Sequence, residues 1–386
     1  MDPALSQVIE RIRAAVAGAT PLRLRGGGTK DFYGEPAGAA ADEAAGEVLD
    51  TRGLAGVTSY EPSELVVTVR AGTPLAELEA LLATRGQCLP FEPPHFGAGA
   101  TVGGMVAAGL AGPSRAGVGS VRDYVLGLSM VNGRGELLTF GGQVMKNVAG
   151  YDVSRLMAGA LGTLGLLTEV SLKVLPVAPA EATLRFALDQ AEALDRLNRW
   201  GGRPLPLNAS RWCEDTPGQG VLHLRLRGAV AAVEAACRTL LAEQPGERLD
   251  REQAADDWTR VCEQQDAWFM PPGGARRVAP QDLWRLSVPQ TAPVLALPGP
   301  MLVEWHGGQR WLHAAREQAD AVRAAALAAG GHATLFRAGT HAGANMVPAC
   351  GRFAPLAPPL DRIHRALKRQ FDPAGLFNRG RLYPDL

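Results

Sequence analysis

The stretch Arg25-Gly26-Gly27-Gly28-Thr29-Lys30 is the most informative part of the chain, and it follows a short apolar run at residues 21–24. Each glycine costs roughly 0.5–1 kcal/mol relative to alanine, because glycine loses the most backbone freedom on folding. A ligand that needs bare backbone N–H groups, usually a phosphate, would offset this cost. A flexible turn is the alternative. The local residues leave both open, although the flanking Arg25 and Lys30 favour an anion site.

Three further glycine-rich segments lie downstream, at residues 97–104, 112–123 and 159–165. Small residues let the backbone lie against an extended ligand, and close packing of backbone on backbone is the alternative. No segment has the G-x-G-x-x-G spacing of a Rossmann dinucleotide site between a strand and a helix, or the G-x-x-x-x-G-K-[ST] spacing of a P-loop. Several separated glycine-rich turns therefore favour a long ligand that crosses many loops.

The composition is that of a globular protein with balanced charge. The 386 residues suggest two or three domains, because a domain usually has ~100–200 residues. Lys plus Arg (39) equals Asp plus Glu (39), which excludes a generally basic nucleic-acid binder but not a local cationic pocket. The five cysteines form no C-x-x-C pair, so the chain offers no iron–sulfur or zinc knuckle of its own. We expect neither a signal peptide nor a transmembrane helix.

The residue patterns of the first half predict an α+β domain. An amphipathic helix is expected within residues 1–20, and strands are expected at residues 65–69, 125–131, 136–140 and 166–174. The last of these strands alternates polar and apolar residues, which is typical of a half-buried strand. Thr73 and Pro74 predict a helix start, with Thr73 as N-cap and Pro74 at the first helical position.

The second half of the sequence predicts long amphipathic helices as well as strands. Amphipathic helices are expected at residues 229–243 and 311–329, with strands at 221–226 and 301–305, and the sequence shows no internal repeat. A proline-bounded linker at residues 176–179 separates the halves. We therefore expect three parts: residues 1–178, 179–354 and 355–386.

The order of six short motifs, together with the tail at residues 371–378, identifies a family resemblance. The motifs are Arg25-Gly-Gly-Gly-Thr29, Phe91-Glu-Pro-Pro94, Ala100-Thr-Val-Gly-Gly104, Gly119-Ser-Val-Arg-Asp123, Lys146-Asn-Val-Ala-Gly-Tyr-Asp152 and Gly162-Thr-Leu-Gly165. They resemble the FAD domain shared with vanillyl-alcohol oxidase and p-cresol methylhydroxylase. The tail resembles the C-terminal return of the D-2-hydroxyacid dehydrogenase branch, and the whole is most similar to the FAD-binding subunits of bacterial glycolate oxidase (glycolate dehydrogenase).

The resemblance implies the fold class α+β. Residues 1–178 would form a two-subdomain FAD-binding domain of the p-cresol methylhydroxylase (PCMH) type. Residues 179–354 would form a second α+β domain, the cap or substrate domain, and residues 355–386 would return to the FAD domain as a helix and tail.

The resemblance also implies which residues hold the cofactor. The expected FAD-binding residues are Arg25, Gly26, Gly27, Gly28, Thr29, Pro94, Gly97, Thr101, Gly103, Gly104, Gly112, Gly117, Ser120, Asp123, Glu169, Val170 and Asn378. The first loop would hold the diphosphate. Covalent members of the family carry a flavin-linking histidine at the position of Thr29, so we expect non-covalent FAD.

The catalytic residues are not identified by sequence. Catalytic relatives carry a metal-linked H-x-G-D-G-N loop, whereas this chain has His341-Ala342-Gly343-Ala344-Asn345, which lacks the aspartate, so no metal site is expected. His341 and Arg337 are weak candidates for a catalytic base and a carboxylate clamp. Lys146 and Tyr151 could lie near the flavin ring, or Tyr151 could be a packed aromatic residue beside a helix capped by Asp152.

The function implied is that of a FAD-binding flavoprotein subunit of a glycolate (2-hydroxy acid) dehydrogenase complex, which oxidises glycolate to glyoxylate through flavin and passes electrons onward. The expected partners are a larger homologous flavoprotein subunit and an iron–sulfur subunit. Two alternatives remain: a self-sufficient FAD-dependent 2-hydroxyacid dehydrogenase, and a non-catalytic FAD-fold scaffold. We expect a cytoplasmic protein whose only route to the inner membrane is peripheral, through its complex.

Overall fold

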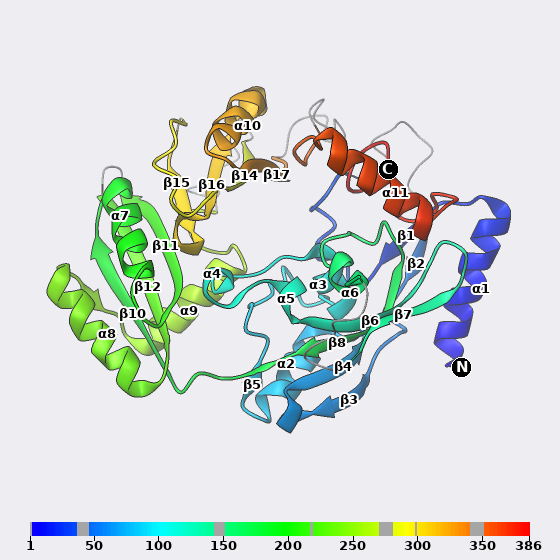
Figure 1. Cartoon of the computed structure of the whole chain (residues 1–386), viewed down its shortest axis with the longest axis horizontal. Coiled ribbons are helices and arrows are strands. Elements are labelled where there is room, and N and C mark those ends of the chain that lie inside the picture. Colours follow the sequence, from blue (N-terminus) through cyan, green and yellow to red (C-terminus); the bar gives the residue numbers. More distant parts are fainter. Residues whose placement is uncertain are drawn as a thin grey trace. The chain divides into compact units, whose positions relative to one another are not determined.

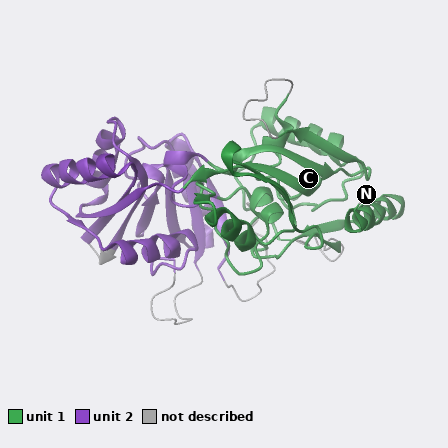
Figure 2. Cartoon of the chain, turned by 90° about the horizontal axis from the view of Figure 1, so that it is seen from below, with its two compact units in different colours: residues 1–110, 120–176, 345–386 green, residues 111–119, 177–344 purple. Residues whose placement is uncertain are grey.

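The computed structural model describes residues 2–36, 46–142, 151–216, 219–269, 281–297, 299–339 and 351–386. The chain divides into two compact units, which Figure 2 colours separately. Unit 1 comprises residues 1–110, 120–176 and 345–386, and unit 2 comprises residues 111–119 and 177–344. The short segment 111–119, expected in the first domain, groups with unit 2.

A five-stranded antiparallel sheet lies at the centre of unit 1 (Figure 1). Its strands, in sheet order, are β3 (Val57–Glu61), β4 (Val66–Arg70), β8 (Leu166–Lys173), β6 (Val125–Val131) and β7 (Leu137–Gly141). The expectation that β8 is half-buried is wrong, because β8 is the central strand and is buried on both faces. Ser171 of this strand pairs inside the protein, because its hydroxyl oxygen lies 2.9 Å from that of Thr68 on β4.

Short helices complete unit 1. They are α1 (Pro3–Gly18), η1 (Pro62–Glu64), α2 (Leu75–Ala83), α3 (Val102–Ala108), α5 (Val121–Tyr124), α6 (Val153–Leu156) and α11 (Pro358–Phe371). The α1 helix packs Val8, Ile9 and Ile12 into a core cluster. The expected cap of α2 is wrong by one residue: Pro74 is the N-cap, and the Thr73 hydroxyl instead accepts a hydrogen bond from the Gly56 N–H at 2.9 Å.

Two short strand pairs tie distant segments of unit 1 together. The strands β5 (Gln87–Cys88) and β9 (Leu175–Pro176) are antiparallel, and β1 (Leu22–Arg25) and β2 (Glu47–Asp50) are parallel. The C-terminal tail runs beside β1, because Leu22 N–H donates to the Leu376 carbonyl at 2.9 Å and Asn378 N–H donates to the Leu22 carbonyl at 3.0 Å. The tail therefore reaches the strand that leads into the glycine-rich stretch.

Unit 2 contains an eight-stranded sheet with the order β13-β10-β12-β11-β15-β16-β14-β17. The strands are β10 (Ala180–Ala187), β11 (Leu207–Thr216), β12 (Gln219–Gly228), β13 (Glu247–Arg248), β14 (Asp282–Ser287), β15 (Met301–Glu304), β16 (Gln309–Ala314) and β17 (His332–Arg337). The helices are α4 (Arg115–Val118), α7 (Gln190–Gly201), α8 (Val230–Glu243), α9 (Arg251–Cys262), η3 (Trp305–Gly307), η4 (Arg316–Gln318) and α10 (Ala319–Ala328). The helix expected at 311–329 therefore begins eight residues late, because residues 311–314 belong to β16.

The strand order reveals a repeat of topology in unit 2. The first half runs β10-α7-β11-β12-α8-β13 and the second half runs β14-β15-β16-α10-β17, with a loop in place of the first helix. Each half arranges its strands in the order fourth, first, third, second, and the halves join where β11 pairs with β15. The sequence shows no repeat, so the duplication exists only at the level of the fold.

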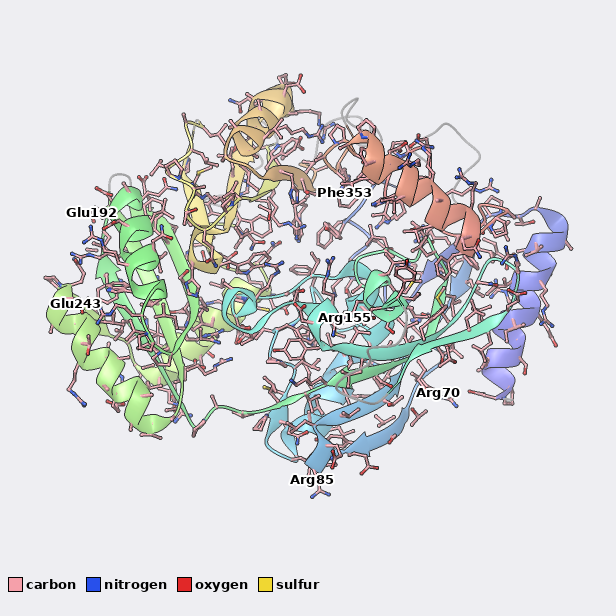
Figure 3. All side chains as sticks on the ribbon, viewed as in Figure 1. Arg70, Arg85, Arg155, Glu192, Glu243 and Phe353 are labelled. Carbon is pink, nitrogen blue, oxygen red and sulfur yellow. The ribbon has the colours of Figure 1, made fainter. Side chains whose placement is uncertain are left out.

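The helices α7 and α8 cover one face of the first half of this sheet (Figure 1), where residues such as Leu184, Leu197 and Leu240 form a buried cluster. Glu243, at the end of α8, lies beside α7 (Figure 3) and accepts a hydrogen bond from the Trp200 indole N–H at 3.2 Å. The α9 helix packs against the sheet too, because its Trp258 N–H donates to the Thr183 hydroxyl at 2.9 Å.

Candidate functional site

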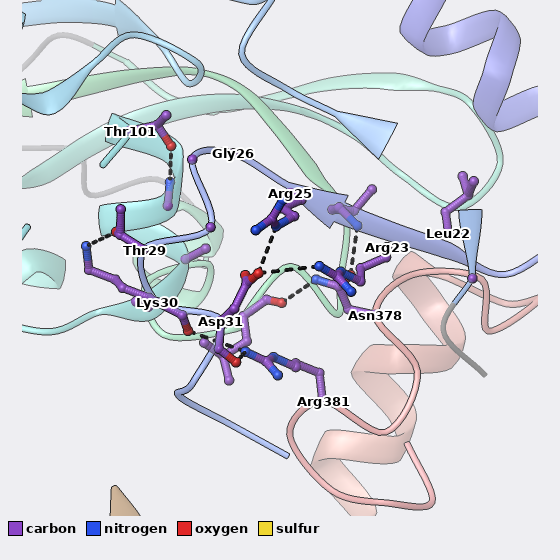
Figure 4. Close-up of a pocket in the computed structure, with 18 of the residues that line it drawn as sticks. Leu22, Arg23, Arg25, Gly26, Thr29, Lys30, Asp31, Thr101, Asn378 and Arg381 are labelled. Carbon is purple, nitrogen blue, oxygen red and sulfur yellow. Dashed lines mark hydrogen bonds and ion pairs between the residues drawn. The ribbon is translucent and has the colours of Figure 1, made fainter. Parts of the chain in front are cut away.

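The glycine-rich stretch at the end of β1 lines a cavity of about 290 Å³ in unit 1 (Figure 4). The loop at residues 26–31 forms one part of the wall. Thr101, Gly104, Ala107 and Ala108 of the α3 segment form another, and the C-terminal tail contributes Asn378, Arg379 and Arg381. A smaller cavity of about 80 Å³ shares Gly104, Ala107 and Asn378 with it and adds Gly103, Gly162 and Gly165.

Four consecutive backbone N–H groups of this loop, from Gly26 to Thr29, have no acceptor among the described residues. Buried or half-buried backbone donors normally have partners, so four consecutive donors at a cavity wall indicate a place for an anionic ligand.

Each glycine of the loop has a separate steric reason. A Cβ on Gly27 would lie 1.5 Å from the carbonyl oxygen of Gly99, and a Cβ on Gly26 would lie 2.5 Å from the Thr101 hydroxyl. Gly28 has φ of +73°, which favours glycine, and the Arg25 guanidinium lies against it. Backbone packing thus explains Gly27, while the free N–H groups of the same loop remain available to a ligand.

The wall of the cavity is strongly cationic. Arg23, Arg25, Lys30, Arg379 and Arg381 all line it, against a single carboxylate among the described lining residues, Asp31. Asp31 pairs with Arg25 at 2.8 Å and with Arg23 at 3.4 Å. The cavity therefore keeps an excess of positive charge, as a diphosphate site requires.

The tail residues hold this wall in place. The Asn378 side-chain oxygen accepts from Leu24 N–H at 2.8 Å, and its amide donates to the Leu161 carbonyl at 2.6 Å. Arg381 donates to the backbone carbonyls of Glu35 and Asp31, both at 2.7 Å. Burial lowers the pKa of Arg381 to about 10, so the side chain still carries its charge at neutral pH.

A buried ion pair anchors the tail itself. Lys368 uses all three donors, to Asp372 and to the carbonyls of Thr163 and Phe377, each at 2.8 Å. Asp372 in turn accepts from the N–H groups of Leu376 and Phe377. Desolvation lowers the pKa of Lys368, and the charge of Asp372 opposes this shift.

The structure brings together about half of the expected cofactor residues. Those that line the two cavities are Arg25, Gly26, Gly27, Gly28, Thr29, Thr101, Gly103, Gly104 and Asn378. Gly97 lies beside them, because a Cβ there would be 3.3 Å from the Thr29 methyl group. Pro94 is buried and lines neither cavity.

Four other expected cofactor residues lie elsewhere in the described structure. Gly112 and Gly117 belong to unit 2, where Gly112 accepts from the Trp305 indole at 3.0 Å. Glu169 and Val170 are interior positions of the central strand β8. None of the four lines either cavity.

Ser120 and Asp123 form a capping box at the start of α5. Burial alone would raise the pKa of Asp123, but two hydrogen bonds from Ser120 and the nearby charges of Arg155 (Figure 3) and Arg122 outweigh it and hold the pKa below its usual value. This carboxylate therefore caps the start of α5.

The weak catalytic candidates do not form a cluster in the described structure. Lys146 and His341 lie outside the described residues. Of the two alternatives for Tyr151, the packed aromatic residue is wrong, because Tyr151 is 99% exposed, although Asp152 does cap α6. Arg337 is in unit 2, where it donates to the Gln264 side chain at 3.3 Å and burial lowers its pKa.

A larger cavity of about 1330 Å³ lies within unit 2. Its arginines are already engaged, Arg211 with Asp266 at 2.7 Å and Arg185 with Glu247 at 2.9 Å. None of the expected cofactor residues lines it. Across the described ranges, no group of three His, Cys, Asp or Glu side chains is placed to hold a metal ion.

Sequence reasoning missed Asp31, Arg381 and Lys368. Asp31 directly follows the glycine-rich stretch and Arg381 lies three residues after the tail motif, so a charged residue beside each motif was the available signal. Lys368 gave no signal, because a lysine on an amphipathic helix is normally solvated.

The residues present fit part of a dinucleotide. Bare N–H groups and arginines suit a diphosphate, whereas a volume of about 290 Å³ lies just below the ~300–1,000 Å³ usual for small-molecule sites. The cavity therefore has room for the diphosphate and its surroundings rather than for a complete FAD.

Comparisons with known proteins identify relatives of this chain. A family model described as FAD binding domain matches residues 4–141. The chain is 44% identical over 379 residues to glycolate oxidase subunit GlcE of Escherichia coli (strain K12), covering 98% of this chain and 97% of that protein. It is 30% identical over 173 residues to glycolate oxidase subunit GlcD of Bacillus subtilis (strain 168), covering 45% of this chain and 36% of that protein.

The fold has solved relatives. A structure of alkyldihydroxyacetonephosphate synthase superimposes with a TM-score of 0.64 at 14% identity, covering 96% of this chain and 73% of that one. At this identity the likeness concerns the fold alone, and with the family model it confirms the expected α+β fold with a FAD-binding domain. In the ranges that the structure describes, no helix is long and apolar enough to span a bilayer.

Proposed function

Because the chain belongs to the glycolate oxidase subunit GlcE family of FAD-dependent oxidoreductases, we propose that it holds FAD without a covalent bond at the cavity beside the glycine-rich loop and serves as a flavoprotein subunit of a glycolate-oxidising complex. The observation that carries the proposal is the row of four N–H groups from Gly26 to Thr29, which have no acceptor among the described residues and lie at the wall of a cationic cavity. A dianion is the ligand that such a wall stabilises best.

The chain's own residues would bind and orient the cofactor. The loop N–H groups and Arg25 would hold the diphosphate, and Asn378 would keep β1 and Leu161 at a fixed spacing around it. Thr29 stands where a flavin-linking residue would be needed and has no nucleophilic ring nitrogen, which favours reversible binding. When bound, FAD supplies the hydride acceptor for oxidation of a 2-hydroxy acid such as glycolate.

The finer assignments rest on the relatives. The names of the Escherichia coli and Bacillus subtilis proteins describe them as subunits, which favours a complex. We propose a larger homologous flavoprotein and an iron–sulfur protein as partners of this chain, with the complex in the cytoplasm and any contact with the inner membrane made through those partners. A partner that carries the substrate-oxidising site would explain why the H-x-G-D-G-N signature is absent from this sequence.

The test fills the cavity without altering the loop. Ala107 lines both cavities and is partly exposed, so Ala107→Leu adds bulk where the cofactor would lie. We expect the variant to lose FAD, measured as released flavin per chain after acid denaturation, and the purified complex to lose glycolate-dependent dye reduction in parallel.

The matched control is Ala76→Leu, on the exposed face of α2. It adds the same side chain to the same unit and should retain full flavin. Equal flavin content in Ala107→Leu and the wild type, with both folded, would contradict the proposed site. Flavin that stays with the precipitated protein after acid treatment would contradict non-covalent binding.

A further inference from the structure

We propose that Asp31 is a positioning residue for the cofactor site: its carboxylate holds the Arg25 guanidinium so that the two terminal nitrogens of Arg25 face a phosphate. The inference rests on the proposed function, since it names how that site grips its anion. It assigns a role to an acid that lines an otherwise cationic wall.

Only one of the three nitrogens of the Arg25 guanidinium donates a hydrogen bond to a described residue. Its Nε donates to Asp31 Oδ2 at 2.8 Å, and neither terminal nitrogen donates to an acceptor among the described residues. An arginine held through Nε keeps its other edge free for two parallel hydrogen bonds, which is how guanidinium groups bind phosphate. The guanidinium also lies against Gly28, whose lack of a Cβ makes room for it.

Asp31 is itself held on several sides, as the dashed lines in Figure 4 show for its side chain and carbonyl. Its N–H donates to the Gly28 carbonyl at 3.1 Å, and its carbonyl accepts from Arg381 at 2.7 Å. Arg23 provides a second, longer contact to the carboxylate at 3.4 Å. The acid is therefore attached both to the glycine-rich loop and to the C-terminal tail, which suits a group that fixes another side chain.

Folding stability does not explain this pair. The side chains of Arg25 and Asp31 are 41% and 46% exposed, and ion pairs that exposed contribute little to stability in water. A carboxylate near a bound diphosphate also repels it, so an acid with no positioning role would weaken cofactor binding. Removing the charge of Asp31 should weaken FAD binding if the carboxylate positions Arg25, and should strengthen FAD binding if it only repels the diphosphate.

The experiment measures the dissociation constants of FAD and of ADP, the diphosphate half of the cofactor, for the full chain by fluorescence titration. Positioning predicts that Asp31→Asn weakens binding of both ligands by about three- to tenfold, which lies in the lower part of the range for coupled neighbours. In an Arg25→Met background the same substitution should no longer weaken binding, because there is no guanidinium left to orient. Asp31→Glu should recover part of the affinity.

The control is Asp195→Asn, which removes one charge from an exposed pair with Arg199 in unit 2 and lines neither cavity of unit 1. Tighter or unchanged binding in Asp31→Asn, or an equal loss in the Arg25→Met background, overturns the inference. If Asp31→Asn binds FAD as the wild type does while Ala107→Leu abolishes binding, the inference fails and the proposed function stands. If the wild-type chain binds neither FAD nor ADP, the proposed function itself fails.

Discussion

Gly27 shows that a glycine can be required by backbone packing and also belong to a proposed ligand site. The sequence suggests either a flexible turn or a bare backbone for a ligand, and neither describes this position fully. A side chain at Gly27 would collide with the Gly99 carbonyl at 1.5 Å, so the glycine is needed because two loops touch. That contact fixes the loop, and a fixed loop would let the N–H groups that lack an acceptor among the described residues act as the preformed anion site proposed above.

His306 is an unusual residue in unit 2. It follows Trp305 in the left-handed region, with φ of +55° after +52°, and such conformations cost about 1–3 kcal/mol each in non-glycine residues. Both ring nitrogens are inaccessible to solvent and have no hydrogen-bond partner among the described residues, although part of the residue remains exposed. Burial lowers the pKa of His306 to about 4.

This shift predicts a loss of stability in acid. The pKa of His306 is lower in the folded chain than the ordinary value of 6.5, so below pH 6.5 the unfolded chain binds a proton that the folded chain excludes. The contribution of His306 should therefore be complete above pH 6.5 and fall by at most about 3 kcal/mol as the pH approaches 4. His313 and His332 have lowered pKa values and act in the same direction.

His306→Asn removes the titrating group and keeps a residue that tolerates the left-handed region. Urea unfolding at pH 7 and at pH 4.5 should show a smaller difference in free energy for the variant than for the wild type. An identical pH dependence for the two proteins would rule out His306 as a contributor.

Among the elements, the C-terminal return matters most for the site. Residues 376–378 run beside β1, the strand that leads into the glycine-rich loop, and Lys368 and Asp372 lock the turn that precedes them. The return therefore supports the wall of the cavity from a part of the chain about 350 residues away in sequence, as in the bond from Leu24 to Asn378.

Removing the lysine of this lock should weaken the whole unit. Lys368→Met leaves the Asp372 carboxylate buried without its counter-charge, and breaking a buried pair in this way typically costs about 3–5 kcal/mol. We expect a lower urea midpoint and a raised FAD dissociation constant. Arg369→Met, an exposed cation next to it on α11, is the control and should change neither by much. Equal effects of the two variants would show that the lock does not support the site.

At the scale of the whole molecule, the aromatic residues divide between the units. All seven tryptophans, Trp200, Trp212, Trp258, Trp268, Trp284, Trp305 and Trp311, belong to unit 2, and all five tyrosines, Tyr33, Tyr60, Tyr124, Tyr151 and Tyr383, belong to unit 1. Tyrosine signals therefore report on the unit with the proposed cofactor site, and tryptophan emission reports on the other.

This division makes the location of the cofactor measurable. A ligand at 100 times its dissociation constant stabilises the unit that binds it by ~2.7 kcal/mol. With excess FAD, fluorine NMR of a fluorotyrosine-labelled chain should show the urea midpoint of unit 1 rising. The urea midpoint of unit 2, followed by the wavelength of its tryptophan emission, should change less. A tryptophan transition that moves more than the tyrosine transition would contradict binding at unit 1.

Much of unit 1 could be predicted from local patterns. The strand at 125–131 forms with the expected bounds, because its apolar residues, with valine at each end, fit a buried position in a sheet. The expectation for the central strand β8 is wrong, because Glu169, Ser171 and Lys173 alternate with apolar residues as on a solvent-facing strand, whereas Ser171 is buried and its hydroxyl lies 2.9 Å from that of Thr68 on β4. A pattern of alternating polar and apolar residues does not show whether a polar side chain faces water or a buried hydroxyl group on a neighbouring strand.

The sequence by itself determined the family, the FAD domain and the loop at residues 26–30, because glycine, charge and motif order are properties of the chain alone. Only the tertiary structure decided which of the expected residues meet at one cavity, that Asp31 and the distant Arg381 join them, and that unit 2 repeats one topology twice. Those features depend on contacts between residues far apart in sequence, and such contacts leave no periodic or compositional trace in the chain.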